Sequence, residues 1–195
     1  MRLRAGRLAL VYGTAAVVVV LDQLTKWLVV RQLGGGRPLK LLGSFLQLRY
    51  TTNSGGAFSL FTGAPLFFAL TATVIAGGIV YAARRAEGRA LLLALGLLLG
   101  GAMGNLGDRL FRGPGPFRGQ VVDWLNLPHF PWTFNLADAS ISCAAVLIAV
   151  LALRGVRIDG ISPAHAADRI GGTPSVAPAP RDGTARLIDS DECAS

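Results

Sequence analysis

The sequence predicts an all-α membrane protein with four transmembrane helices and, on the outer face of the membrane, a small β ribbon and an interfacial segment. Hydrophobic residues make up 52% of the 195 residues, charged residues only 15%, and the mean hydropathy is +0.50. Soluble domains carry roughly 25% charged residues, so a bilayer is the natural solvent for this chain. The apolar residues fall in four blocks, each near the roughly 20 residues that a membrane-spanning helix requires: Leu8 to Val30, Ala64 to Ala83, Ala90 to Leu110 and Thr133 to Leu153.

The first block is predicted to be a retained helix rather than a cleaved signal peptide. Arg2, Arg4 and Arg7 precede the apolar run, as in an export signal, but the run continues through DQLTKWLVV without a small-residue cleavage site. Four crossings then put both termini on one side of the membrane. Eight Lys and Arg residues flank the helix ends on that side, against six in the opposite loops. This excess predicts that the N- and C-termini are cytoplasmic.

The two long connections between blocks are predicted to emerge together on the outer face. Between the first and second blocks, SFLQLRYTT places Leu46, Leu48 and Tyr50 on one side, an alternation that favours a short β ribbon at the membrane surface. Between the third and fourth blocks, the aromatic residues and prolines of VVDWLNLPHFPW indicate an interfacial segment. The remaining link, RRAEGR, is short, so the second and third helices are predicted to be antiparallel neighbours.

The third block contains Gly96, Gly100 and Gly104 at four-residue spacing. Small residues in that register let two helices approach closely in lipid. We therefore interpret these glycines as packing residues.

The charge is distributed unevenly along the chain. Residues 1–154 hold 15 Lys and Arg against five acids, whereas residues 155–195 hold four against six, which gives net charges of +10 and −2. A basic membrane domain over 1–154 predicts contact with anionic phospholipid head groups, and no basic run interleaved with aromatic residues indicates a nucleic-acid partner. The segment 155–195 is rich in Ala, Pro and Gly and is predicted to be a disordered tail.

Carboxylates and amides gather where the blocks meet the predicted outer face. A carboxylate inside a membrane is costly and usually marks a functional site. Asn105 and Arg109 are four residues apart, so they project from one helix face, and Asn135 opens the fourth block. Four acids lie in the outer half of the predicted membrane: Asp22, Asp108, Asp123 and Asp138.

A pair of aspartates is the simplest chemistry that these residues support. A catalytic triad is poorly supported, because His129 and His165 are the two histidines in the sequence, and Lys26 has no activated serine near it in sequence. Two carboxylates that share a site cannot both ionise easily, so one acts as acid and the other as base. Asp123 and Asp138 are the best pair, because the 14 residues between them can fold back over the start of the fourth helix.

Structural roles are the alternatives for several of these residues. Asp22 could cap or tie a neighbouring helix through hydrogen bonds, and Asn53 could make a turn with the glycines that follow it. Asp108, next to Arg109, could form a structural ion pair or face lipid head groups. Asp138 could simply interact with the dipole of its helix. Two other protein classes also stay open: a proton-coupled transporter, whose carboxylates should be spread through the membrane depth, and a structural membrane subunit.

Five segments resemble one family, the lipoprotein signal peptidases, also called type II or prolipoprotein signal peptidases. These segments are DQLTKW at 22–27, NSGGAF at 53–58, GNLGDR at 104–109, VVDW at 121–124 and FNLAD at 134–138. They occur in the family order, and the resemblance covers about residues 8–153. Gly107, where an aliphatic residue is common, and Trp124, where Phe is more usual, depart from the family pattern.

The resemblance implies an aspartic endopeptidase of the bacterial inner membrane with its site near the outer surface. It would remove signal peptides from prolipoproteins by cutting before a diacylglyceryl-modified cysteine, without a metal or organic cofactor, and globomycin-type inhibitors would block it. Asp123 and Asp138 match the catalytic pair. The positions that would bind substrate or shape the site are Asp22, Asn53, Asn105, Arg109 and Asn135.

Overall fold

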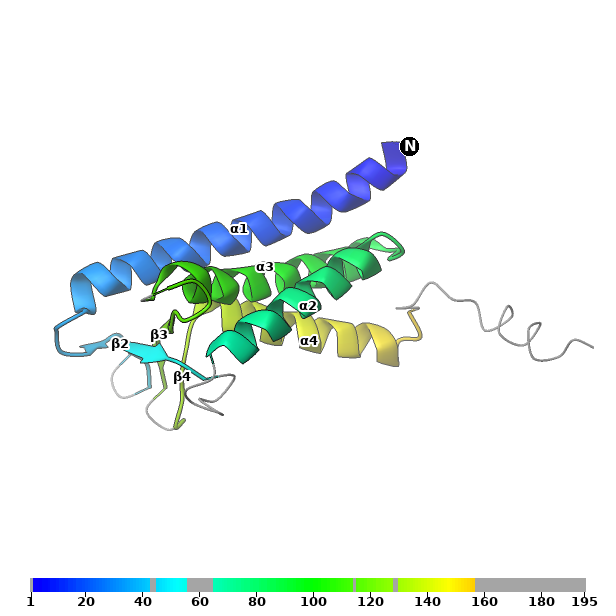
Figure 1. Ribbon diagram of the computed structural model, residues 1–195. Helices are drawn as coiled ribbons and strands as arrows, with labels where there is room; N and C mark the ends of the chain where they lie inside the picture. Colours follow the sequence, from blue (N-terminus) through cyan, green and yellow to red (C-terminus); the bar gives the residue numbers. More distant parts are fainter. Residues whose placement is uncertain (1, 43–44, 56–64, 114, 128–129, 157–195) are drawn as a thin grey trace, which may run out of the picture. The chain divides into compact units, whose positions relative to one another are not determined.

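The computed structural model describes residues 2–42, 45–55, 65–113, 115–127 and 130–156. Its helices are α1 (Arg2–Leu33), α2 (Pro65–Ala83), α3 (Arg89–Phe111) and α4 (Leu136–Leu153), and its strands are β1 (Leu39–Lys40), β2 (Gln47–Asn53), β3 (Val121–Asn126) and β4 (Thr133–Phe134) (Figure 1). Most of the predicted tail and part of the NSGGAF motif lie outside these residues.

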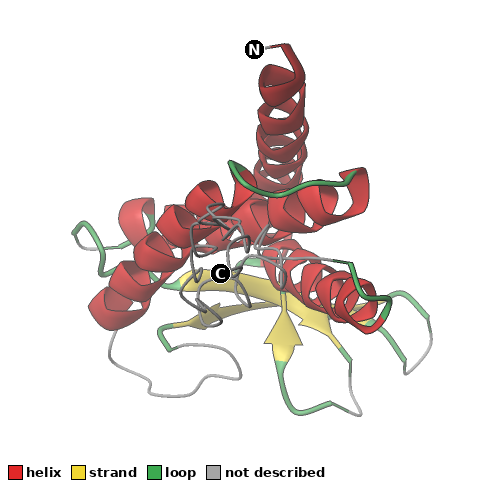
Figure 2. Ribbon diagram, turned by 90° about the vertical axis from the view of Figure 1, so that its right-hand side faces the viewer, coloured by secondary structure: helices red, strands yellow, loops and turns green. Residues whose placement is uncertain are grey.

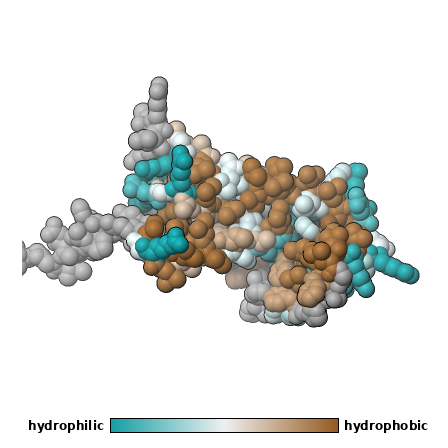
Figure 3. All heavy atoms as spheres, turned by 180° about the vertical axis from the view of Figure 1, so that it is seen from behind, coloured by the Kyte–Doolittle hydropathy of each residue, from teal (hydrophilic) through white to brown (hydrophobic). Residues whose placement is uncertain are grey.

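Each of these four helices is long and apolar enough to cross a membrane, which confirms the four predicted crossings. The start of α1, the end of α4 and the α2–α3 connection lie at one end of the helices, and the sheet lies at the other (Figure 1). Large apolar side chains such as Val74 and Val146 are 74% and 65% exposed. On the face that Figure 3 shows, the surface between the ends is largely hydrophobic, with hydrophilic groups at both ends. A lipid-facing surface accounts for this exposure, because burial against protein is not needed for apolar side chains in a bilayer.

The third helix is the centre of the bundle. In the most apolar stretch of 18 residues of each helix, 61% of the residues of α3 are buried, against 22%, 17% and 22% for α1, α2 and α4. Its glycines contact α1: a Cβ added at Gly100 would lie 2.6 Å from Cβ of Val18, and one at Gly104 would lie 2.7 Å from Oδ2 of Asp22. The interpretation of these glycines as packing residues is therefore confirmed.

The strands form one antiparallel sheet in the order β1-β2-β3-β4 beside the ends of the helices (Figure 2). The two long connections therefore lie on the same face, as predicted, because β2 comes from the first and β3 from the second. The sheet is larger than the predicted ribbon. In β2 the register shifts between Leu48 and Thr51, and such an irregularity interrupts the alternation of the two faces.

The segment VVDWLN was predicted to be interfacial but not to be a strand, and these residues form β3. Val121, Val122 and Asp123 are buried, and β3 pairs with β2 on one side and β4 on the other. Asp123 lies opposite Thr51 of β2. Thr133, the first residue of the fourth apolar block, belongs to β4, and the helix begins after Asn135, which caps it.

Candidate active site

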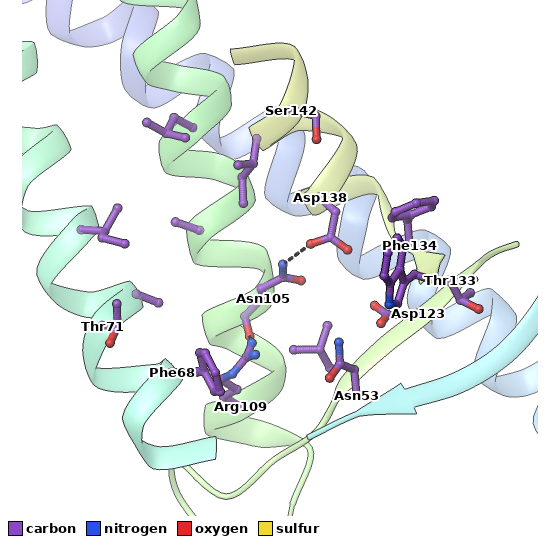
Figure 4. A pocket seen from close by; sticks show the side chains of 17 residues that line it. Asn53, Phe68, Thr71, Asn105, Arg109, Asp123, Thr133, Phe134, Asp138 and Ser142 are labelled. Carbon is purple, nitrogen blue, oxygen red and sulfur yellow. Dashed lines mark hydrogen bonds between the residues drawn. The ribbon is translucent and has the colours of Figure 1, made fainter. Parts of the chain in front are cut away.

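A cavity of about 370 Å³ lies between α2, α3, α4 and the sheet. Its polar wall is formed by Asn53, Asn105, Arg109, Asp123 and Asp138 (Figure 4). Its apolar wall includes Phe68, Ile75, Leu98 and Ile141. Five of the seven predicted site residues thus line one space, although they come from four different elements.

Asp138 is fixed by the start of its own helix and by α3. It is the third residue of α4, where its side chain and that of Asn135 form a reciprocal capping box: Oδ2 of Asp138 accepts the Asn135 N–H at 3.2 Å, and Oδ1 of Asn135 accepts the Asp138 N–H at 2.9 Å. Oδ1 of Asp138 accepts a hydrogen bond of 2.8 Å from Nδ2 of Asn105 (Figure 4). The predicted interaction of Asp138 with its helix terminus and its place in the cavity are therefore both present.

Asp123 is held on β3 in a buried position. The residue is only 3% exposed, and its Oδ1 accepts a hydrogen bond of 2.6 Å from Nδ2 of Asn135. Burial raises the pKa of Asp123 to about 7, and the charge of Asp138 acts in the same direction, while hydrogen bonds from Asn135 and Asn53 oppose the rise. Desolvation disfavours the charged form of a carboxyl group, so Asp123 holds its proton to near neutral pH.

Arg109 connects α3 to the turn that follows β2. Its guanidinium donates to the carbonyl oxygen of Gly55 at 2.8 Å and to that of Asn105 at 3.2 Å, and it lies 5.8 Å from the ring centroid of Phe68. Oδ1 of Asn53 accepts the Gly55 N–H at 2.8 Å. The turn role expected for Asn53 is thus present, and the same residue lines the cavity.

Asn135 and Asp22 lie behind the cavity wall rather than in it, and both are fully buried. Asp22 accepts the N–H of Ala137 at 3.0 Å and so ties α1 to the start of α4. The expected structural role of Asp22 as a tie between helices is therefore present. Asn135 reaches both predicted catalytic residues, as described above.

The structural ion pair expected for Asp108 is present, but with partners other than Arg109. Among the described residues, Asp108 forms ion pairs with Lys26 at 2.8 Å and Arg112 at 2.7 Å. Consecutive residues on a helix point in different directions, so Arg109 faces the cavity while Asp108 faces α1. Lys26 was not predicted to take part, although Asp22 stands four residues before it, a spacing that places both side chains on one helix face and pairs them at 2.8 Å.

The described residues contain no group of three or more His, Cys, Asp or Glu side chains that could hold a metal ion. The arrangement suited to chemistry is the carboxyl pair with its amide and guanidinium neighbours. Such a pair can activate a water molecule and protonate a carbonyl oxygen.

The fold and the site together define a multi-pass membrane protein with two carboxyl groups at one end of its helices. A family model described as signal peptidase (SPase) II matches residues 14–154, a range that encloses all five motif segments. The lipoprotein signal peptidase of Mycobacterium avium (strain 104) is 42% identical over 163 residues, which cover 84% of this chain and 89% of that protein. The lipoprotein signal peptidase of Mycobacterium tuberculosis (strain ATCC 25618 / H37Rv) is 41% identical over 160 residues, which cover 82% of this chain and 79% of that protein.

Solved structures agree with this assignment. Two structures described as a bacterial membrane enzyme, determined by the in meso method at 2.3 and 1.9 Å resolution, match with TM-scores of 0.65 and 0.62 and 28% identity. The matches cover 72% of this chain and 85% and 90% of the solved chains. The chain belongs to the signal peptidase II family, which confirms the family that the motifs predicted.

Proposed function

We propose that this chain is a membrane aspartic endopeptidase that removes signal peptides from prolipoproteins by hydrolysing the amide bond before the diacylglyceryl-modified cysteine. The observation that carries the proposal is that Asp123 on β3 and Asp138 on α4 line one cavity at the sheet end of the helices. Membership of the signal peptidase II family supports the substrate class and the hydrolytic reaction.

One of the two carboxyl groups acts as the general acid and the other as the general base. We assign Asp123 as the acid, because its pKa of about 7 keeps it protonated in the range where an ordinary aspartate is ionised. We assign Asp138 as the base, because each of its oxygens already accepts an N–H group and neither needs a proton of its own.

The reaction then proceeds in two steps. Asp138 takes a proton from water as the water oxygen attacks the carbonyl carbon, and Asp123 gives its proton to the carbonyl oxygen. When the tetrahedral intermediate collapses, the C–N bond breaks and the amine nitrogen takes the proton held by Asp138. A hydroxyl proton of the intermediate returns to Asp123, which restores both side chains to their starting state.

The shape of the cavity suits an amide that is anchored in lipid. A diacylglyceryl cysteine keeps its acyl chains in the bilayer, so the bond before it lies near the membrane surface. The apolar wall runs along α2 from Phe68 to Ile75, about 10 Å of helix, and offers a surface for apolar substrate groups. We propose that Arg109, Asn53 and Asn105 bind the substrate backbone or shape the space around it, and that Asp22 and Asn135 hold the site from behind.

We also propose the membrane placement that the sequence predicts. The protein would lie in the bacterial inner membrane in contact with phospholipids, with cytoplasmic termini, a cytoplasmic tail over 155–195 and the cavity facing outward. Globomycin-type inhibitors would compete for the same cavity. Inhibition of the purified protein by globomycin, measured in the cleavage assay below, tests whether such inhibitors act on this protein.

The decisive experiment is cleavage of a diacylglyceryl-modified prolipoprotein by the purified protein in detergent. Wild type should cut before the lipidated cysteine, as identified by mass spectrometry of the products. Asp123→Asn and Asp138→Asn should lose activity while remaining folded, because each keeps the side-chain size but removes the acid.

A matched control is Glu87→Gln, which alters an exposed acid that pairs with Arg7 at the opposite end of the helices. This variant should cut at the wild-type rate. If wild type leaves the substrate intact where another member of the family cuts it, the proposed function is wrong.

A further inference from the structure

Lys26 is a fully buried lysine on α1 that the proposed reaction does not use. Its ammonium group lies 2.8 Å from Oδ2 of Asp22, 2.8 Å from Oδ2 of Asp108 and 3.0 Å from Oδ1 of Asn105. A buried charge is costly unless it is paired and hydrogen-bonded, and this cation is paired with two carboxylates that are themselves fully buried. Lys26 therefore holds α1 and α3 together through polar contacts.

The contact with Asn105 decides which way that amide faces. A lysine ammonium group only donates hydrogen bonds, so Asn105 must present its oxygen to Lys26. Asn135 also donates to the same oxygen at 3.1 Å. The amide nitrogen of Asn105 is therefore left to face Asp138, to which it donates at 2.8 Å.

The two carboxylate partners of Lys26 hold the backbone beside the two predicted catalytic residues. Asp22 accepts the N–H of Ala137, the residue before Asp138, at 3.0 Å. Asp108 accepts the N–H of Val122, the residue before Asp123, at 3.1 Å. The buried Lys26 thus contacts three groups that each hold part of the site: Asn105 itself, Asp22, which holds the start of α4, and Asp108, which holds the start of β3.

We propose that Lys26 is a positioning residue for the aspartate pair, acting through Asn105, Asp22 and Asp108 without contacting the substrate. This inference rests on the proposed function, because it assigns a role in the same reaction. The two aspartates come from different elements, and a small displacement of either would break the shared geometry that the reaction needs.

The charge of Lys26 also reaches the aspartate pair. The groups that face Lys26 are Asp22 from α1 and Asp108 from α3, with Arg112 beyond Asp108. Asp123 and Asp138 lie beyond the two asparagines, and Arg109 lines the same cavity. A nearby cation favours the ionised form of a carboxyl group, and Lys26 lowers the pKa of Asp123 in this way. Its loss should raise that pKa further.

Lys26→Met tests the proposal, because methionine keeps much of the side-chain volume and removes the charge and the donors. We expect kcat to fall on the order of tenfold to a hundredfold, the scale of a small misplacement of reacting groups, with KM little changed. The loss of activity with rising pH should also move to higher pH. A variant that is merely less stable would lose activity equally at all pH values, and that result would overturn the proposal.

A second comparison asks whether Lys26 acts through Asn105. In the Asn105→Ala background, Lys26→Met should cost less than it does in wild type, because part of its effect has already been removed. If the combined loss in kcat equals the product of the two single losses, then Lys26 does not act through Asn105 and the proposal is wrong.

Lys26→Met leaves Asp22 and Asp108 as buried acids without their cation, so that variant could fail to fold. The double variant Asp22→Asn, Lys26→Met removes one charge of each sign and leaves Asp108 paired with Arg112. It should regain thermal stability and keep the low kcat, because Asn105 still lacks its lysine. Full recovery of kcat with stability would overturn the proposal. Wild type in the same assay separates this from failure of the proposed function, which would leave wild type inactive.

Discussion

The side-chain amide of Asn135 donates a hydrogen bond of 2.6 Å to Oδ1 of Asp123. The oxygen of the same amide caps α4 by accepting the Asp138 N–H. One asparagine therefore starts a helix and orients a carboxyl group on the neighbouring strand. Substitutions that keep the cap and remove the amide donor can separate these two roles.

Replacing Asn135 by serine should lower the rate of cleavage although the helix cap, and with it most of the stability, is kept. Serine caps a helix about as well as asparagine, whereas alanine does not. Asn135→Ser should therefore be more stable than Asn135→Ala by about 1 kcal/mol, while both variants lose about tenfold or more in kcat, because neither carries the amide NH2 group that donates to Asp123. Thermal unfolding and cleavage kinetics of the two variants test this. Wild-type kcat in Asn135→Ser would show that the hydrogen bond to Asp123 is not needed.

The pH dependence of cleavage should follow Asp123. Because its pKa is raised to about 7, the protonated form needed to act as acid is present below that pH and is lost as the pH rises through it. We therefore expect kcat/KM to fall with rising pH near neutrality rather than near pH 4, the region of an ordinary aspartate. Thermal stability measured at each pH separates this effect from unfolding.

A substitution at Asn53 should shift the pH at which kcat/KM falls. The hydrogen bond from Asn53 lowers the pKa of Asp123, so Asn53→Ala should move the fall in kcat/KM to higher pH. If the pH dependence of kcat/KM is unchanged in this variant, then a group other than Asp123 controls the loss of activity at high pH.

Much of this architecture follows from the sequence alone. The apolar blocks predict the four spanning helices, because a bilayer leaves the backbone few alternatives to a helix. Asn105 and Arg109, four residues apart, were expected on one helix face, and both line the cavity. The Asp123 and Asp138 pairing followed from chemistry and loop length, and both residues line that cavity too.

The contacts between elements could not be predicted in the same way. Lys26 and Asp108 are far apart in the sequence, and nothing in the sequence around either residue shows that α1 and α3 are in contact there. Asp108 was paired with Arg109 because the two are adjacent in the sequence, whereas its partner Lys26 lies on another helix. The strand β3 was missed because VVDWLN is buried by pairing with β2, whereas its composition alone also fits an interfacial segment.

Two glycines on α3 provide a matched test of helix contact. A Cβ at Gly104 would lie 2.7 Å from Oδ2 of Asp22, whereas the nearest atom to a Cβ at Gly107 would be Nε2 of Gln23 at 3.8 Å. Gly104→Ala should therefore cost about 1–3 kcal/mol through overpacking and should displace Asp22 from its contacts. Gly107→Ala should be neutral or stabilising by up to about 1 kcal/mol, because alanine favours helices. Thermal unfolding in detergent compares the two, and equal stabilities would contradict the close contact at Gly104.

The guanidinium of Arg109 should not be replaceable by an ammonium group. Arg109 donates to the carbonyl oxygens of Gly55 and Asn105 at the same time, and lysine lacks the planar fork that spans two acceptors. Arg109→Lys should therefore lower kcat/KM by about tenfold, because the turn after β2 is no longer held to α3 beside the carboxyl pair. Arg49→Lys, at an exposed position on β2, is the matched control and should cut like wild type. If Arg109→Lys also cuts like wild type, the positive charge alone is sufficient and the bridge between the turn and α3 is not required for cleavage.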